Sequence, residues 1–224
     1  GGPRPVQLAI VDSASLPVLL HLSEDRSFRG VAICSVSRWD FPGMPEKWKT
    51  ANDYVSYYND LTPARIIERK IKTALEMRFV SLLPEARLDR AFMSMLFDKW
   101  PDDQYTRLYP DRSRTADFSR FARLPTRKKI IAGGEQYKAA PVLTDEDFER
   151  GIARFARAIK KIEQRDGHVI FVRLPSSGPL RKIEKRIFPR NKYWDKLVKK
   201  SSMGGVHFED YPTLSGYDCP DYVH

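Results

Sequence analysis

Short apolar runs alternate with amphipathic stretches near the start of the chain. Residues 6–11 (VQLAIV) and 30–36 (GVAICSV) are continuous apolar runs, a pattern that predicts strands buried on both faces. Between them, residues 15–25 carry leucines at helical spacing, with Pro17 in the first turn. Strand, helix and strand within about 30 residues indicate a βαβ unit, so we expect a parallel sheet.

A strong helix signal follows residue 140. Thr144 with Asp147 three places later predicts a capped helix start. Gly167 is expected to end the helix in a left-handed conformation. Between this start and this end, apolar residues recur at helical spacing and form one stripe: Phe148, Ile152, Phe155, Ile159 and Ile162.

The strand pattern then resumes. Residues 168–175 (HVIFVRLP) are the best strand candidate in the chain, and a helical stretch at 180–200 separates them from a last strand at 205–211 (GVHFEDY). Because the strand and helix alternation returns, residues 45–140 are predicted to be a helical and irregular insertion within one α/β domain spanning 1–224.

Residues 51–83 of that insertion are helical in pattern, and residues 88–100 (LDRAFMSMLFDKW) are predicted to form another helix. Thr62 and Pro63 are typical of an N-cap and a first helical position. The apolar face that follows contains Ile66, Ile67, Ile71, Leu75 and Phe79.

The composition and the net charge limit which classes of partner are expected. The 224 residues are 42% hydrophobic, enough for a packed core, and the formal net charge is +10. Such a charge favours nucleic acid, anionic lipid or an acidic substrate as partner. The chain has no zinc finger, arginine-rich arm or single-strand stacking motif, so nucleic acid is not expected as a partner. No apolar run has the length of a membrane span.

The cysteines and the basic residues are expected to have structural roles. Cys34 and Cys219 are too few for a disulfide framework, and free thiols with Cys34 buried in a strand are favoured over a single bridge. The basic stretch 181–200, together with Arg38 and Arg173, is expected to be solvated, with binding of an anionic substrate as the alternative. His168 and His207 are expected to be satisfied core or edge histidines.

Residues suited to nucleophilic chemistry follow the first and last predicted strands. Ser13 and Ser15 come after residues 6–11, and a tail with Asp221 and His224 comes after 205–211. Open parallel sheets bind ligands at the carboxyl ends of their strands. A serine hydroxyl becomes a good nucleophile when an imidazole accepts its proton and a carboxylate orients that imidazole. Backbone N–H groups at a helix start can hold the resulting oxyanion.

These features resemble a known family. A strand ending in Asp12-Ser13, a βαβ start and a closing Asp221-x-x-His224 resemble the SGNH (GDSL-type) hydrolases. Residues 165–178 (RDGHVIFVRLPSSG) and 210–224 (DYPTLSGYDCPDYVH) look like the later part of bacterial members of unknown substrate. The resemblance implies a flavodoxin-like three-layer α/β/α sandwich with a central parallel sheet. It also implies hydrolysis or transfer of ester-linked acyl groups.

The resemblance also assigns roles to residues. Ser13 would be the nucleophile, His224 the base and Asp221 its orienting partner. The oxyanion donors would be the backbone N–H of Ser13, with Gly43 and Asn59 as further candidates. Ser15 stays open as an alternative nucleophile. The chemistry needs no metal or cofactor.

The expected substrate is a small acyl ester or an acylated carbohydrate, with an acetyl ester of a cell-envelope carbohydrate foremost. An upstream anchor outside this sequence would give peripheral membrane contact and a position at the periplasmic side of the cell envelope; without one the chain would be cytoplasmic. The rival hypothesis is a catalytically inactive binding module that uses a basic surface for an anionic glycan or a membrane surface. Two departures from the family pattern favour that rival: Val11 replaces a glycine, and Asn59-Asp60 lack the preceding glycine of the family's Gly-x-Asn-Asp block. The oligomeric state is left open.

Overall fold

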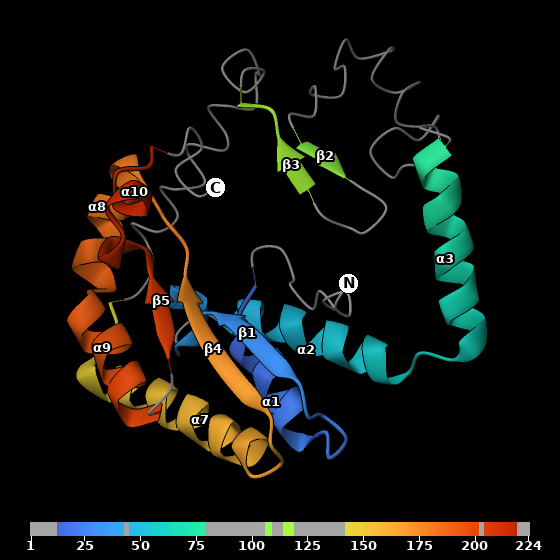
Figure 1. Cartoon of the computed structure of the whole chain (residues 1–224), viewed down its shortest axis with the longest axis horizontal. Coiled ribbons are helices and arrows are strands. Elements are labelled where there is room, and N and C mark those ends of the chain that lie inside the picture. Colours follow the sequence, from blue (N-terminus) through green and yellow to red (C-terminus); the bar gives the residue numbers. More distant parts are fainter. Residues whose placement is uncertain are drawn as a thin grey trace. The chain divides into compact units, whose positions relative to one another are not determined.

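The computed structural model describes residues 13–42, 45–78, 106–108, 114–118, 142–201 and 204–218. The chain divides into two compact units (Figure 1). The first unit comprises residues 1–58 and 131–224, and the second comprises residues 59–130. The second unit therefore falls within the predicted insertion.

A three-stranded parallel sheet forms the centre of the first unit (Figure 1). Strand β1 (Val31–Ser35) pairs with β4 (His168–Arg173), and β4 pairs with β5 (Gly205–His207). These strands and the α/β class agree with the sequence-based expectation. The strand predicted at 6–11 and the helix predicted at 88–100 lie outside the described residues. Because β1 and β4 are hydrogen-bonded neighbours along all five residues of β1, no further strand lies between them.

The helices precede or connect these strands. Helix α1 (Leu16–Glu24) leads into β1, α7 (Asp145–Glu163) leads into β4, and α8 (Gly178–Ile187) and α9 (Arg190–Ser201) connect β4 with β5. Helix α2 (Pro45–Asn59) starts earlier than expected, because Pro45 stands at its first position, where the missing N–H costs nothing. The described part of this unit also contains short helical turns at η1 (Arg38–Asp40), η3 (Phe208–Asp210) and α10 (Pro212–Ser215).

Helix α7 confirms its sequence prediction in detail. Thr144 and Asp147 form a reciprocal capping box, and the whole predicted apolar stripe is buried. The left-handed residue at its end is Asp166, with φ of 60°, so the expectation for Gly167 was wrong. Gly167 is required for a different reason: a Cβ there would lie 2.6 Å from Ile162 Cγ2.

One face of the sheet is covered. Cys34, Phe171 and Gly205 are register partners and therefore share a face. Phe155 of α7 packs edge-on against Phe171, with ring centroids 5.5 Å apart. Gly205 leaves room for Trp194 of α9, because a Cβ would lie only 2.8 Å from its ring.

The opposite face is open. Val31, Ile33 and Ile170 point to that side and are 58%, 73% and 39% exposed. The expectation that residues 30–36 form a strand buried on both faces was therefore wrong for β1, and the same expectation for residues 6–11 falls outside the described residues. Successive strands step in one direction across the sheet, and right-handed crossovers then place the described connecting helices of this unit, α7, α8 and α9, on the same face. The described residues of the first unit consequently form two layers, one of helices and one of strands.

An aromatic cluster fills the core beneath the covered face. Phe41 is fully buried, and its ring packs against those of neighbouring helices and loops. Gly151 of α7 makes this possible, because a Cβ there would lie 2.4 Å from the Phe41 ring. The rings in contact with Phe41 are Phe148, Phe155, Phe188 and Tyr193.

The second unit contains helix α3 (Pro63–Arg78) and a small antiparallel pair, β2 (Thr106–Leu108) with β3 (Arg114–Ala116). The Thr62 side chain accepts the backbone N–H of Arg65 at 3.3 Å, which confirms the expected helix start. Across the described parts of both units, no helix is long and apolar enough to cross a membrane.

Candidate active site

The turn containing Ser13 and Ser15 lies at the carboxyl end of β1. The Ser15 hydroxyl donates to the carbonyl of Ser35, the last residue of β1, over 2.7 Å. Ser15 is also the N-cap of α1. The two candidate serines therefore stand at the sheet edge where ligands of parallel α/β proteins bind.

Asp40 fixes this turn to the segment that follows β1. Its Oδ1 accepts the backbone N–H groups of Ser15 and Leu16, at 2.6 and 2.8 Å. Its Oδ2 accepts the backbone N–H of Ser37 at 2.7 Å. Asp40 is fully buried, and burial raises the pKa of its carboxyl, while the hydrogen bonds from Ser37, Leu16 and Ser15 oppose that rise. The carboxylate thus caps the start of α1 from a distant part of the chain.

The two candidate serines differ in what holds their hydroxyl groups. Ser15 Oγ lies within hydrogen-bond distance of Ser35 O, Asp40 Oδ1 (2.9 Å) and Cys34 Sγ (3.3 Å). Its single proton is shared among these partly buried acceptors, so Ser15 has a structural role. Ser13 is half-buried, and its hydroxyl donates to the carbonyl of Lys47 over 2.8 Å. Ser13 is the candidate whose proton a base could reach by one side-chain rotation.

Cys34, behind Ser15, is a free buried thiol, as expected. Burial raises its pKa to about 12, and the nearby Asp40 carboxylate adds to the rise. A thiol with such a pKa stays protonated and is a poor nucleophile. Cys219 lies outside the described residues.

The carboxyl end of β4 carries a buried charge pair. Arg173 forms an ion pair with Glu184 of α8 at 2.7 Å, and Ser176 donates to the other oxygen of the same carboxylate at 2.6 Å. Arg38 is fully buried and donates to the carbonyl of Pro42 at 3.3 Å. The expectation that Arg38 and Arg173 are solvated was wrong, because both stems are enclosed at this edge of the sheet.

His207 at the end of β5 is a core histidine. Its Nδ1 accepts the backbone N–H of Glu209 at 3.2 Å, so a neutral ring carries its proton on Nε2, which lies 3.2 Å from the Tyr193 hydroxyl. Burial lowers the pKa of His207 to about 4, and the nearby Arg190 guanidinium lowers it further. The prediction of a satisfied histidine at this position is confirmed.

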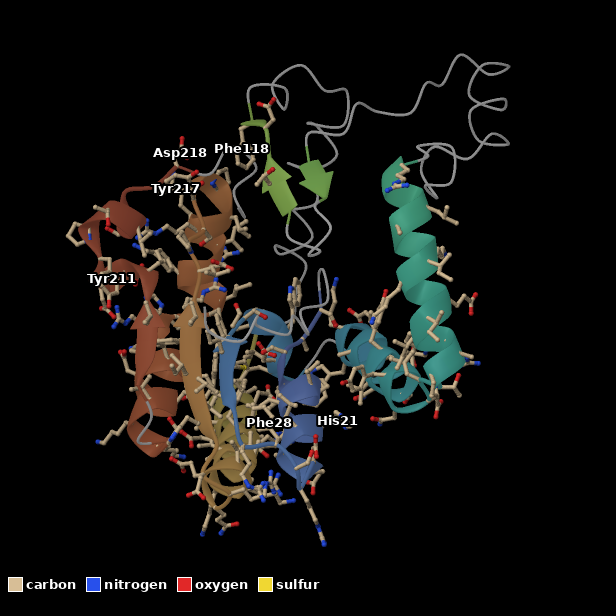
Figure 2. All side chains as sticks on the ribbon, turned by 45° about the vertical axis from the view of Figure 1, so that its right-hand side comes forward. His21, Phe28, Phe118, Tyr211, Tyr217 and Asp218 are labelled. Atoms are coloured by element: carbon tan, nitrogen blue, oxygen red, sulfur yellow. The ribbon has the colours of Figure 1, made fainter. Side chains whose placement is uncertain are left out.

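The last described residues also belong to this edge. Arg181, in the first turns of α8, donates to the carbonyl of Ser215 over 2.6 Å and pairs with Glu209 at 3.3 Å. In Figure 2, Tyr217 and Asp218 lie at the upper end of the first unit, and Phe28, which precedes β1, lies at its lower end. The segment that leads to the closing Asp-x-x-His is therefore held at the carboxyl side of the sheet.

Three of the predicted site residues, Gly43, Asp221 and His224, lie outside the described residues. Asn59 is the exposed last residue of α2 and the first residue of the second unit. Ser13 and Ser15 lie in one turn. Among the described contacts, none joins Asn59 to either serine.

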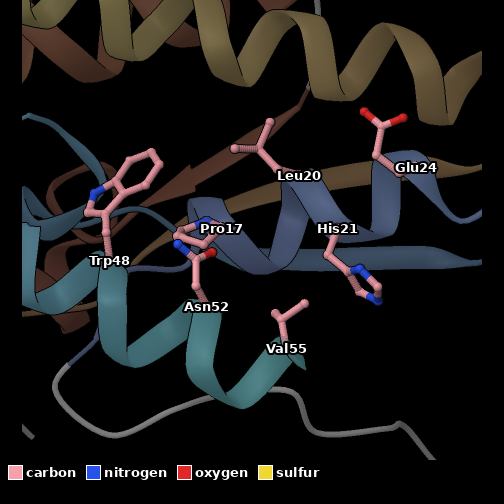
Figure 3. A pocket seen from close by; sticks show the side chains of 7 residues that line it. All are labelled: Pro17, Leu20, His21, Glu24, Trp48, Asn52 and Val55. Carbon is pink, nitrogen blue, oxygen red and sulfur yellow. The ribbon is translucent and has the colours of Figure 1, made fainter. Parts of the chain in front are cut away.

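A groove begins beside the serine turn (Figure 3). It lies between α1 and α2 and has a volume of about 470 Å³. Its end at Pro17 and Trp48 follows Ser13 and Lys47 closely in sequence, and Trp48 is anchored by a hydrogen bond from its Nε1 to Trp39 O at 2.9 Å. The walls combine apolar and polar side chains: Pro17, Leu20, His21, Glu24, Trp48, Asn52 and Val55.

Sequence reasoning missed Asp40, Glu184 and the groove. A signal for Asp40 was present, because Ser37-x-x-Asp40 has the spacing of a capping box, which η1 indeed forms. Glu184 lies in a basic stretch and gave no local signal, since its partners Arg173 and Ser176 belong to the preceding strand and loop.

The basic stretch 181–200 is largely paired with acids. Lys192, Lys196 and Lys200 of α9 reach acidic side chains of α7, and Arg190 pairs with Asp195 and Asp210. These exposed pairs align two packed helices, and each contributes little free energy. Their arrangement favours a structural role over an anion-binding surface.

Comparison with known proteins gave no match among family models, curated proteins or solved structures.

Proposed function

We propose that this chain is a serine-dependent ester hydrolase or O-acyltransferase. Ser13 attacks the carbonyl carbon of an acyl ester while His224 accepts the Ser13 proton and Asp221 orients the imidazole. The proton then passes from His224 to the leaving alkoxide, and water or a carbohydrate hydroxyl resolves the acyl-serine. The N–H of Ser13, with Gly43 and Asn59 as further candidates, would stabilise the oxyanion. An acetylated cell-envelope carbohydrate is the substrate class suggested by the family resemblance.

One observation carries the proposal: the serine turn and the segment that leads to Asp221 and His224 lie at the same edge of a parallel sheet. The Ser15–Ser35 hydrogen bond fixes the first, and the Arg181–Ser215 hydrogen bond fixes the second. Carboxyl edges of such sheets are where catalytic groups from separate loops meet. The groove at Pro17 and Trp48 offers an apolar wall for the acyl group.

We further propose that the full architecture is the three-layer flavodoxin-like sandwich. The order β1-β4-β5, with all connecting helices on one face, fits the last three strands of a 2-1-3-4-5 sheet. In that order the first strand lies between the second and the third. A β1 that pairs directly with β4 therefore does not fit the position of the second strand. The family resemblance places the nucleophile directly after the first strand of the sheet. If β1 is not the second strand, Ser13 need not follow the first, so the identity of the nucleophile is the first point to test.

The test is labelling of the whole chain with a fluorophosphonate probe, followed by peptide mass spectrometry. We expect modification at Ser13 that disappears in Ser13→Ala and in His224→Ala. Ser27→Ala is the matched control, because Ser27 is an exposed serine bonded to Asp25 on the opposite side of the first unit. Thermal unfolding of each variant verifies that the fold persists.

Labelling at another serine would keep the chemistry and reject Ser13 as the nucleophile. A folded chain that takes no label at any serine would reject the hydrolase proposal. That result would favour the inactive binding module. The binding surface would then have to lie outside α9, because Lys192, Lys196 and Lys200 are already paired with acidic side chains.

A further inference from the structure

Helix α3 of the second unit presents an apolar face to solvent. Ile66, Ile67, Ile71 and Leu75 are 41%, 59%, 55% and 42% exposed. These positions recur every four residues or lie beside one another, so they form one broad stripe along the helix. Large apolar side chains exposed together indicate a surface that is covered by something when the protein functions.

Two cations interrupt this stripe, and one acid, Glu68, borders it beside Leu75. Lys70 stands four residues after Ile66 and three after Ile67, and Arg78 stands three after Leu75, so both lie on the apolar side of the helix. Arg65 and Lys72 lie on the other side, and the described acidic side chain of α3 is Glu68. Lys70 and Arg78 are themselves exposed. Basic side chains thus outnumber acidic ones around an aliphatic face.

This pattern discriminates between two kinds of occupant. In a protein groove, Lys70 and Arg78 would be buried with the isoleucines, which costs several kcal/mol per unpaired charge (a rough figure). At a membrane surface, the same side chains bury their methylene stems and extend their charges to the headgroup level. A basic amphipathic helix with a wide apolar face is the arrangement that lies in the plane of an anionic bilayer.

We propose that α3 is a membrane-surface helix that binds anionic lipid through Ile66, Ile67, Ile71 and Leu75, with Lys70 and Arg78 contacting phosphate headgroups. The proposal concerns the second unit alone and does not depend on the chemistry assigned to Ser13. It differs from anchoring by an upstream segment, because the contact is formed by residues of this chain.

The experiment is flotation of the whole chain with vesicles of phosphatidylcholine and phosphatidylglycerol in equal amounts, compared with phosphatidylcholine alone. We expect binding to the anionic vesicles that weakens as salt rises. Ile67→Glu combined with Ile71→Glu should weaken binding by about tenfold or more, since two buried aliphatic groups are lost. Val142→Glu is the matched control, because Val142 is 73% exposed outside α3 and its replacement should leave binding unchanged.

Three outcomes would overturn the proposal. The whole chain could fail to float with anionic vesicles. The Ile67→Glu, Ile71→Glu variant could bind as tightly as the parent, which would mean that the net charge alone attracts the chain. Finally, the parent could fail to bind vesicles while the Ile67→Glu, Ile71→Glu variant unfolds at a markedly lower temperature than the parent. This combination would show that another part of the protein covers the stripe.

Discussion

The two faces of the parallel sheet differ although the same three strands build them. On one face, Phe171 and its register partners lie beneath α7 and α9 and form the core. On the other, Ile33 and Ile170 are open in the described part of the chain. Successive residues of a strand point to opposite sides, so neighbours such as Ile170 and Phe171 have opposite environments.

This contrast shows how little an apolar residue's identity says about its burial. Both faces of β1 carry apolar residues, which is why the sequence indicated that this strand is buried on both sides. The direction in which the strands follow one another placed the connecting helices on one side. The covered face therefore carries the stability that the described residues supply, and the following predictions test that asymmetry.

The largest effect is expected on the covered face. Phe171→Ala should lower the free energy of unfolding by about 3–5 kcal/mol, because it removes a fully buried ring and leaves a cavity against Phe155. Urea unfolding followed by circular dichroism measures this. Ile170→Ala, one residue away on the open face, is the control and should cost far less. Equal losses for the two variants would show that the two faces are covered alike.

A pH-dependent effect of intermediate size is expected at the end of the covered face. The pKa of His207 is about 4 in the folded chain, below its ordinary value of 6.5, so the folded state binds fewer protons than the unfolded state between these values. The stability that the neutral ring contributes is complete above about pH 6.5 and is lost as the pH falls toward 4, by about 3 kcal/mol in total.

Urea unfolding across that pH window measures the effect. His207→Gln should be less stable than the parent at neutral pH, because it loses ring packing on Phe208, yet it should lose less stability on acidification. Parallel pH profiles for the parent and the variant would contradict a neutral His207 in the core.

The smallest effect is expected on the open face. Ile33→Lys should change the free energy of unfolding by less than about 0.5 kcal/mol, because a long polar side chain is tolerated where Ile33 is mostly exposed. The same urea titration measures it. A loss above about 2 kcal/mol would mean that a further layer covers this face, since a lysine would then be buried without a partner. That result would support the three-layer architecture.

The sequence by itself determined the elements whose signals are local. Helix α7 was predicted from its capping box and its stripe, because the contacts that start an amphipathic helix lie within four residues of one another. The strands β1, β4 and β5 were located for the same reason.

At the candidate site, the sequence placed Ser15 correctly at the start of α1, while the strand predicted before Ser13 lies outside the described residues. It could not distinguish their hydroxyl environments, since Asp40 and Ser35 reach Ser15 from more than 19 residues away. It likewise could not foresee Glu184 as the partner of Arg173. The roles of Asp221 and His224 stay predictions, because both lie outside the described residues.

Tertiary structure alone decided which face of the sheet is covered, which serine hydroxyl is held by several partners, and which cations are paired. Each of these depends on contacts between segments distant in sequence, and nothing in the local pattern of residues fixes such a distance. Local hydrogen bonds and periodicity specify where a helix or strand forms. The order in which strands pair then determines what each side chain meets.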